Sequence, residues 1–192
     1  MSKKVRLSVL GFSFNQTQSG AYGLVLAEEE GLRRLMVVVG APEAQSIAFQ
    51  LQGSVPPRPL THDLFKTLLG ELNIRLSEVE IYKYDNGVFF SKIRLVQGEQ
   101  HIEIESRTSD AIAIALRTKS PIYTTELIMQ MQGVIFDEGN NDDNSLEEEK
   151  SDFALDYSLL DKNELESLLN DAVAGEDYEL ASLIRDELRK KE

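Results

Sequence analysis

Two short segments of this sequence combine acidic, basic and hydroxyl side chains in a way that suits phosphate chemistry. The candidate residues are His62 and Asp63 in the first segment and Glu105, Arg107, Ser109 and Asp110 in the second. Hydrolysis of a phosphodiester needs either metal-held water with carboxylate ligands, or an acid–base side chain beside a cation that faces the phosphate. The two segments together contain residues for both routes.

Both segments lie where a helix is predicted to begin. Residues 61–72 carry apolar side chains at helical spacing behind Thr61, and residues 108–118 repeat this pattern behind Thr108. Each threonine stands where it can cap the first turn of its helix. The amide groups at a helix amino end can also receive a phosphate. We therefore expect a single site if the two helix starts meet at one edge of a sheet.

The same residues also suit a purely structural role. Asp63 and Asp110 each follow a threonine by two positions, which is common at helix amino ends and contributes about 0.5–2 kcal/mol through capping. Arg107 would then pair with Asp63 or Asp110 and tie the two helices together. His101 lies among predicted strand residues and is expected to be exposed. No Gly-rich phosphate loop, zinc-binding spacing or Ser/His/Asp arrangement is recognisable.

Composition narrows the class of protein. The chain has 192 residues and no cysteine, which excludes disulfides, thiol nucleophiles and Cys-ligated metal centres. Its amino end enters an apolar/polar alternation at once, without the long apolar run of a signal peptide or membrane span. We therefore expect a cytoplasmic protein with no membrane partner.

The net charge of −13 is unevenly distributed. Residues 1–136 contain fourteen acidic and fourteen basic side chains, so the excess of negative charge falls on residues 137–192. Residues 137–157 are acidic and poor in apolar side chains, which predicts a linker. An alternative is that this segment mimics nucleic acid and shields a basic site. A neutral body would bind RNA or DNA weakly and with strong dependence on salt.

The remaining patterns predict the elements that must position the candidate residues. Strands are expected over 3–14, 22–26, 35–39, 79–84, 88–96 and 101–105, and a further helix over 42–51. Asn86-Gly87 between two strand-like runs is a strong hairpin signal. Clustered strands separated by helices favour an α+β fold with a largely antiparallel or mixed sheet and packed helices. Long hairpins expose edge strands, so we also expect a homo-oligomer.

Residues 158–192 are expected to form a separate small unit. Helical patterns over 159–174 and 178–191 are joined by a connection of three residues, so the two helices should be antiparallel. Leu165, Leu168, Leu169 and Ala172 would face Leu180, Ala181, Ile184 and Leu188. A hairpin of this size rarely has a core of its own. It should therefore pack against another copy, the body or a partner.

The sequence Arg58-Pro-Leu-Thr-His-Asp-Leu-Phe65, together with residues 105–117 (Glu-Ser-Arg-Thr-Ser-Asp-Ala-Ile-Ala-Ile-Ala-Leu-Arg), resembles the two signature stretches of the bifunctional nuclease domain family. The resemblance extends over residues 3–134, and residues 1–136 are taken as that domain. It departs at Glu105, where the family more often has Asp, and at Thr108, where it more often has Pro.

This resemblance implies hydrolysis of phosphodiester bonds in RNA or DNA and allows for a divalent metal cofactor, Mg²⁺ or Mn²⁺. The residues expected to be catalytic are His62, Asp63, Arg107, Ser109 and Asp110. Those expected to bind substrate are Arg58, Thr61 and Arg117. Those expected to bind the metal are Glu105 and Asp110.

Residues 177–188, Asp-Tyr-Glu-Leu-Ala-Ser-Leu-Ile-Arg-Asp-Glu-Leu, resemble the UVR motif of bacterial nucleotide-excision repair subunits and of some stress-response adaptors. In that family such hairpins mediate contacts between proteins, so the resemblance implies a protein partner. The alternative function is therefore a non-catalytic oligomeric adaptor or regulator in DNA repair or stress response.

Overall fold

The computed structural model describes residues 3–13 and 21–135 and, near the carboxyl end, residues 162, 165, 166, 169, 173 and 178–190. The strands are β1 (Lys4–Ser13), β2 (Tyr22–Glu28), β3 (Arg33–Val39), β4 (Arg75–Asp85), β5 (Val88–Gln97), β6 (Gln100–Arg107), β7 (Ile122–Thr125) and β8 (Val134–Ile135). The helices are α1 (Ala41–Leu51), α2 (Thr61–Glu71), α3 (Thr108–Thr118), α4 (Glu126–Gln132) and α6 (Tyr178–Lys190).

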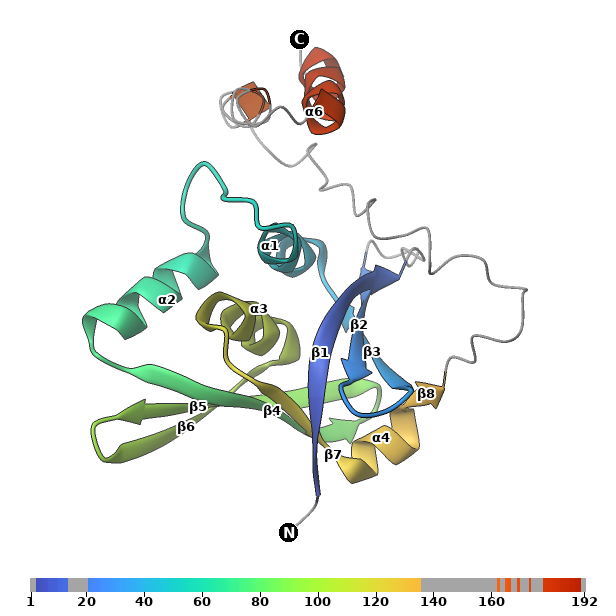
Figure 1. Cartoon of the computed structure of the whole chain (residues 1–192), viewed down its shortest axis with the longest axis vertical. Helices are drawn as coiled ribbons and strands as arrows, with labels where there is room; N and C mark the ends of the chain where they lie inside the picture. The colour runs from blue at the N-terminus through green and yellow to red at the C-terminus, as the bar shows by residue number, and fades with distance from the viewer. Residues whose placement is uncertain are drawn as a thin grey trace.

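One mixed sheet organises these elements (Figure 1). Its eight strands run in the order β6-β5-β4-β7-β1-β2-β3-β8. Neighbouring strands are antiparallel except β4 and β7, which pair in parallel from Val79 opposite Ile122 to Ile81 opposite Thr124. The short strand β7 thus joins two antiparallel halves. The predicted α+β class with a mixed sheet is confirmed.

The turn between β4 and β5 follows the predicted hairpin chemistry. Asn86 and Gly87 have φ angles of 50° and 83° and lie between the paired residues Asp85 and Val88. Two successive positive φ angles give a turn whose twist matches that of the flanking strands. The predicted Asn-Gly hairpin is therefore confirmed.

This turn gives a prediction for stability. Gly87→Ala should lower the free energy of unfolding by about 1 kcal/mol, because a Cβ atom is disfavoured at positive φ. No heavy atom lies within 4 Å of the added Cβ, so backbone strain alone acts. Gly70→Ala in α2 is the matched control, because its Cβ also meets open space and alanine favours a helix by about 0.5–1 kcal/mol. Urea denaturation should show opposite signs for the two variants; equal effects would contradict this explanation.

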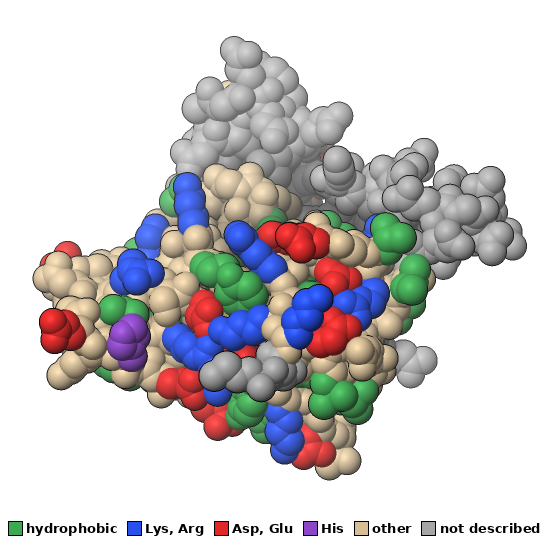
Figure 2. All heavy atoms as spheres, turned by 60° about the horizontal axis from the view of Figure 1, so that its bottom comes forward, with side chains coloured by type: hydrophobic (Ala, Val, Ile, Leu, Met, Phe, Trp, Pro, Cys, Tyr) green, Lys and Arg blue, Asp and Glu red, His purple; other side chains and the backbone are tan. Residues whose placement is uncertain are grey.

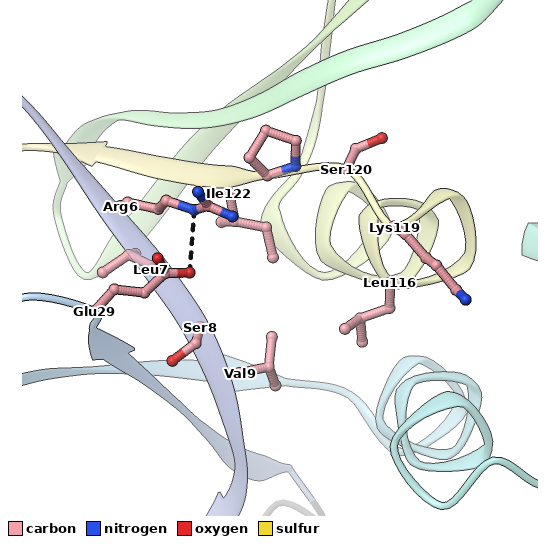
Figure 3. A pocket seen from close by; sticks show the side chains of 10 residues that line it. Arg6, Leu7, Ser8, Val9, Glu29, Leu116, Lys119, Ser120 and Ile122 are labelled. Atoms are coloured by element: carbon pink, nitrogen blue, oxygen red, sulfur yellow. Dashed lines mark ion pairs between the residues drawn. The ribbon is translucent and has the colours of Figure 1, made fainter.

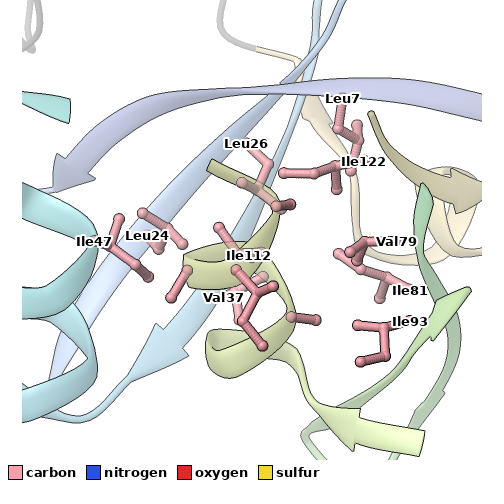
Figure 4. Close-up of a cluster of buried hydrophobic side chains, with 14 of the residues drawn as sticks. Leu7, Leu24, Leu26, Val37, Ile47, Val79, Ile81, Ile93, Ile112 and Ile122 are labelled. Carbon is pink, nitrogen blue, oxygen red and sulfur yellow. The ribbon is translucent and has the colours of Figure 1, made fainter. Parts of the chain in front are cut away.

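Helices α1, α2 and α3 cover one face of the sheet and close the main core. Figure 4 shows Ile112 of α3 among side chains of the surrounding strands and of α1. Most of α3 is buried, and its buried residues include Ala111, Ala113 and Ala115, whose small side chains allow close packing. Helix α3 contacts α1, α2, β4 and β5. Its amino end is therefore fixed relative to both neighbouring helices.

The carboxyl-terminal region packs against the body. The predicted second helix is confirmed as α6, whereas the predicted first helix and the linker 137–157 lie largely or wholly outside the described residues. Leu165, Ala181 and Ile184 form one buried apolar cluster with Ala48 and Phe49 of α1. Of the alternatives left open by the sequence, the described residues show packing on the body. None of the described helices has the length and apolar character needed to cross a membrane.

Candidate functional site

The amino ends of α2 and α3 meet on the helical side of the sheet. His62, in the first turn of α2, has its Nε2 atom 3.1 Å from Oδ1 of Asp110 in the first turn of α3. The two residues are separated by 48 positions in the chain. The convergence that the catalytic hypothesis needs is therefore present.

Arg107 joins this pair at the surface. Its Nε atom donates to Oδ2 of Asp110 at 2.6 Å, and its Nη1 atom lies 2.8 Å from Oε1 of Glu43 in α1. The Arg107 side chain is 67% exposed, whereas those of Asp110 and Glu43 are 26% and 17% exposed. The Nη2 atom of Arg107 also donates to Oδ1 of Asp110 at 3.0 Å, so each guanidinium nitrogen has a carboxylate partner. A guanidinium has five N–H donors, so an exposed one can bind a phosphate in addition.

The electrostatics keep Asp110 ionised. Burial alone would raise the pKa of Asp110, but hydrogen bonds from Arg107 and His62 outweigh it and lower the pKa below its ordinary value. The Asp110 carboxylate in turn raises the pKa of Arg107. At neutral pH the site thus presents a carboxylate and a guanidinium together.

A buried hydroxyl completes the surroundings of His62. Ser46 of α1 places its Oγ atom 2.8 Å from Nδ1 of His62, so both ring nitrogens have hydrogen-bond partners. Ser46, His62 and Asp110 are therefore aligned in space, although no such arrangement was recognisable in the sequence. Ser46 is only 3% exposed, which prevents it from reaching a substrate as a nucleophile. Its hydroxyl instead orients the imidazole, as the outer member of such an array does.

Asp63 and Arg117 form a structural pair behind the site. Nε of Arg117 donates to Oδ1 of Asp63 at 2.6 Å, and its Nη1 atom donates to the backbone oxygens of Ser46 and Ala113 at 3.1 Å. Oδ2 of Asp63 accepts from the backbone N–H of Leu60 at 2.9 Å. The Arg117 side chain is 1% exposed. It therefore links α1, α2 and α3 and is not accessible to a substrate.

The two threonines do not cap their helices. The cap position of α2 is Leu60, whose N–H is bonded by Asp63, and Thr61 is exposed one residue later. The cap position of α3 is Arg107, without a side-chain cap. Thr108 is instead drawn inward, where its hydroxyl bonds to Ser91 and to the backbone oxygen of Phe89. The predicted capping roles of both threonines are therefore wrong.

The other expected substrate and catalytic residues lie near the surface. Arg58 is exposed in the segment before α2, and Ser109 is half-buried in the first turn of α3. The first amides of α3 thus lie beside Arg107 with no side-chain cap over them. Such an amino end suits a negatively charged group.

Glu105 does not join this cluster. It pairs in register with Lys92 and, with Tyr82, Lys92 and Glu103, lines a hollow on the face of the sheet that the helices leave open. Figure 2 shows that face, where acidic and basic side chains are mixed. Glu105 and Asp110 are therefore on opposite sides of the sheet. Among the described residues no three His, Asp or Glu side chains are grouped to hold a metal ion. The divalent cofactor, Mg²⁺ or Mn²⁺, stays a prediction.

A second hollow lies at the other end of α3, between β1 and the start of β7 (Figure 3). Its lining includes Lys119 and an ion pair of 3.1 Å between Arg6 and Glu29. None of the residues expected to be catalytic lines it. The candidate site therefore remains at the amino ends of α2 and α3.

The two partly buried carboxylates of the site region predict a specific response to acid. The pKa of Asp63 is also lowered, because its hydrogen bonds with Arg117 and Leu60 outweigh its burial. A carboxyl group whose pKa is lowered on folding stabilises the folded protein at every pH above its unfolded-state pKa of about 3.9. This contribution to the free energy of unfolding is lost as the pH falls through the folded-state pKa. The free energy of unfolding should therefore drop below pH ~4. The drop should be shallower in an Asp63→Asn, Asp110→Asn variant; an unchanged slope in urea titrations would contradict the assignment.

Comparison with known proteins agrees with this architecture. Residues 24–137 match the model of the bifunctional nuclease domain, and residues 162–192 match that of the UvrB/uvrC motif. Uncharacterized proteins MT1877 and Rv1829, from two strains of Mycobacterium tuberculosis, are each 36% identical to this chain over 135 residues. The aligned part covers 70% of this chain and 80% of each relative. The domain match includes both helix starts that form the site, and on this basis the chain belongs to the bifunctional nuclease domain family.

Proposed function

We propose that the protein hydrolyses phosphodiester bonds in RNA or DNA at the joined amino ends of α2 and α3. The observation that carries this proposal is the contact of His62 with Asp110 beside the exposed guanidinium of Arg107. The family of the chain is consistent with such an activity. The site has a base, an orienting group and a phosphate-binding cation within hydrogen-bond distance of one another.

Each side chain has a distinct part in the proposed reaction. Arg107 and the first amides of α3 bind the non-bridging oxygens of the phosphate. Asp110 accepts one proton from the attacking water as a new P–O bond forms, while His62, held by Ser46, fixes the carboxylate in place. One ester P–O bond breaks, and the leaving oxygen takes a proton from solvent. The reaction needs no reactant other than water and the substrate.

Purified full-length protein tests this proposal directly. It should cleave single- or double-stranded RNA or DNA, assayed with and without added Mg²⁺ or Mn²⁺. Arg107→Ala should slow cleavage by about 10², the cost of removing one preorganised donor to a developing charge. Arg75→Ala, which removes an exposed arginine at the start of β4, is the matched control. Equal rates for both variants would count against Arg107 as the phosphate ligand.

Binding of the substrate should be weak and sensitive to salt. Residues 1–136 carry no net charge, so few phosphates are neutralised when nucleic acid binds. Loss of a single phosphate contact in Arg107→Ala should reduce the slope of log affinity against log salt by about one.

A non-catalytic adaptor is the second candidate function. The neutral body and the match of residues 162–192 to the UvrB/uvrC motif favour it. Under this function, wild-type protein would cleave no nucleic acid under any of the conditions above but would still bind a protein partner through its carboxyl-terminal region. Homo-oligomerisation stays a prediction for either function, and light scattering at micromolar concentration tests it.

A further inference from the structure

The carboxyl-terminal region is seated on the elements that build the site. Below, Leu165, Leu169 and α6 are together called the C-terminal segment. Its residues Leu165 and Ile184 are fully buried in the cluster with Ala48 and Phe49 of α1, each of which is 1% exposed. Leu60, immediately before α2, packs against the same cluster. The contact is thus made with α1 and with the start of α2.

Both contact points adjoin residues that hold His62 or are next to it in the chain. On α1, Ser46 bonds Nδ1 of the imidazole and lies two and three positions before Ala48 and Phe49. At the start of α2, the backbone N–H of Leu60 bonds Asp63, next to His62 in the chain. Any change in how the C-terminal segment sits on α1 and Leu60 must therefore act on the groups that hold His62.

Among the side chains of α6 that the structure describes, the apolar ones face the body. Ala181 and Ile184 are buried against the body, and Leu188 packs beside them, whereas Ser182 and Arg185 are exposed. A protein with an apolar groove that binds α6 through this face would have to remove it from α1 and Leu60. Binding to the body and binding to such a partner exclude each other.

We propose that the C-terminal segment regulates the His62 site. When docked, it holds α1 against the start of α2 and keeps the contacts of His62 with Ser46 and Asp110 in place. A partner protein that takes the apolar face of α6 releases these supports and lowers the activity of the site. The link to catalysis rests on the proposed nuclease function, but the link to the geometry of His62 does not.

The chain provides a convenient reporter, because His62 and His101 are its two histidines. His101 is exposed on β6, the edge strand of the sheet. Two-dimensional NMR spectra of the imidazole rings of full-length protein should thus contain one signal set for the site and one internal reference.

Ile184→Asp places a charge in the buried cluster and should displace the C-terminal segment. Ser182→Asp adds the same charge at an exposed position of the same helix.

The expected result is that Ile184→Asp shifts the ring signals of His62 and leaves those of His101 unchanged, while Ser182→Asp shifts neither. Ala181→Asp, at a second buried position of α6, should repeat the effect of Ile184→Asp. Exchange of the α1 amides with solvent shows that the C-terminal segment has left α1. If these amides become exchangeable in both buried-site variants while the His62 signals stay unshifted, the proposal is overturned. Shifts of equal size in the Ser182→Asp control would overturn it as well.

Cleavage assays on the same variants separate the effect on the geometry of His62 from the effect on catalysis. Ile184→Asp should lower the rate at least ~5-fold relative to Ser182→Asp, the lower end of usual coupling between sites. If the His62 signals shift but the wild type cleaves nothing, the proposed nuclease function is contradicted and the link to the geometry of His62 stands. If the His62 signals shift but Ile184→Asp and Ser182→Asp cleave at equal rates, the proposed regulation is contradicted and the nuclease function stands.

Discussion

Replacing Arg117 by methionine should lower the free energy of unfolding by about 3–5 kcal/mol, among the largest effects of any single substitution in the body. The Arg117 side chain is 1% exposed and is bonded to Asp63 and to backbone oxygens of α1 and α3. Methionine fills similar volume but leaves the Asp63 carboxylate without its charged partner. Because Asp63 is still 24% exposed, water compensates in part, which favours the lower end of this range.

Denaturation in urea at pH 7 measures this effect. Lys119→Met, two residues further along and exposed, serves as the matched control and should change stability by less than ~0.5 kcal/mol. Adding Asp63→Asn to Arg117→Met should cost less than the sum of the two single changes, because they share one interaction. Strict additivity would mean that the ion pair does not tie the helices together.

Asp110→Asn should reduce the rate of phosphodiester cleavage by about 10²–10⁴, the usual contribution of a positioned general base. Asparagine keeps the shape of the side chain but cannot accept a proton at neutral pH. It also removes the charge that holds Arg107, so the apparent affinity for substrate should change as well. The cost in stability should be small, because Arg107 is mostly exposed and exposed ion pairs contribute about 0–1 kcal/mol.

Steady-state kinetics on single-stranded substrate measure the expected loss. Asp85→Asn, at an exposed aspartate paired with Lys83 near the β4–β5 turn, is the control for loss of a surface carboxylate. A variant Asp110→Asn that is folded and cleaves as fast as Asp85→Asn would exclude Asp110 as the base.

Local sequence patterns were sufficient to predict most elements of the fold. The Asn86-Gly87 turn and helices α1, α2 and α3 appear where period and turn chemistry predict them. The strand β7 and the helix α4 were missed. With four and seven residues respectively, they are too short to show a period. The pairing of β7 with both β4 and β1 is a long-range contact, and a local pattern contains no information on it.

The site could be predicted only in part, for the same reason. The helix starts at His62 and Asp110 were identified from sequence, but the contributions of Ser46 and Glu43 depend on how α1 packs beside α2 and α3. Their positions in α1 resemble ordinary helix residues, so no sequence signal could have found them. Glu105 was assigned to the site because it lies in the same signature stretch as Asp110. The alternation of β6 instead turns it to the open face, opposite Lys92.

The most direct test compares cleavage by wild-type protein with cleavage by a His62→Ala, Asp110→Ala double variant shown to be folded by its unfolding transition. With a labelled single-stranded oligonucleotide in single-turnover conditions, we predict hydrolysis by the wild type. The double variant should be slower by about the same factor as Asp110→Asn alone, because residues that act as a unit are not additive. Equal rates for the wild type and the folded double variant would contradict the account.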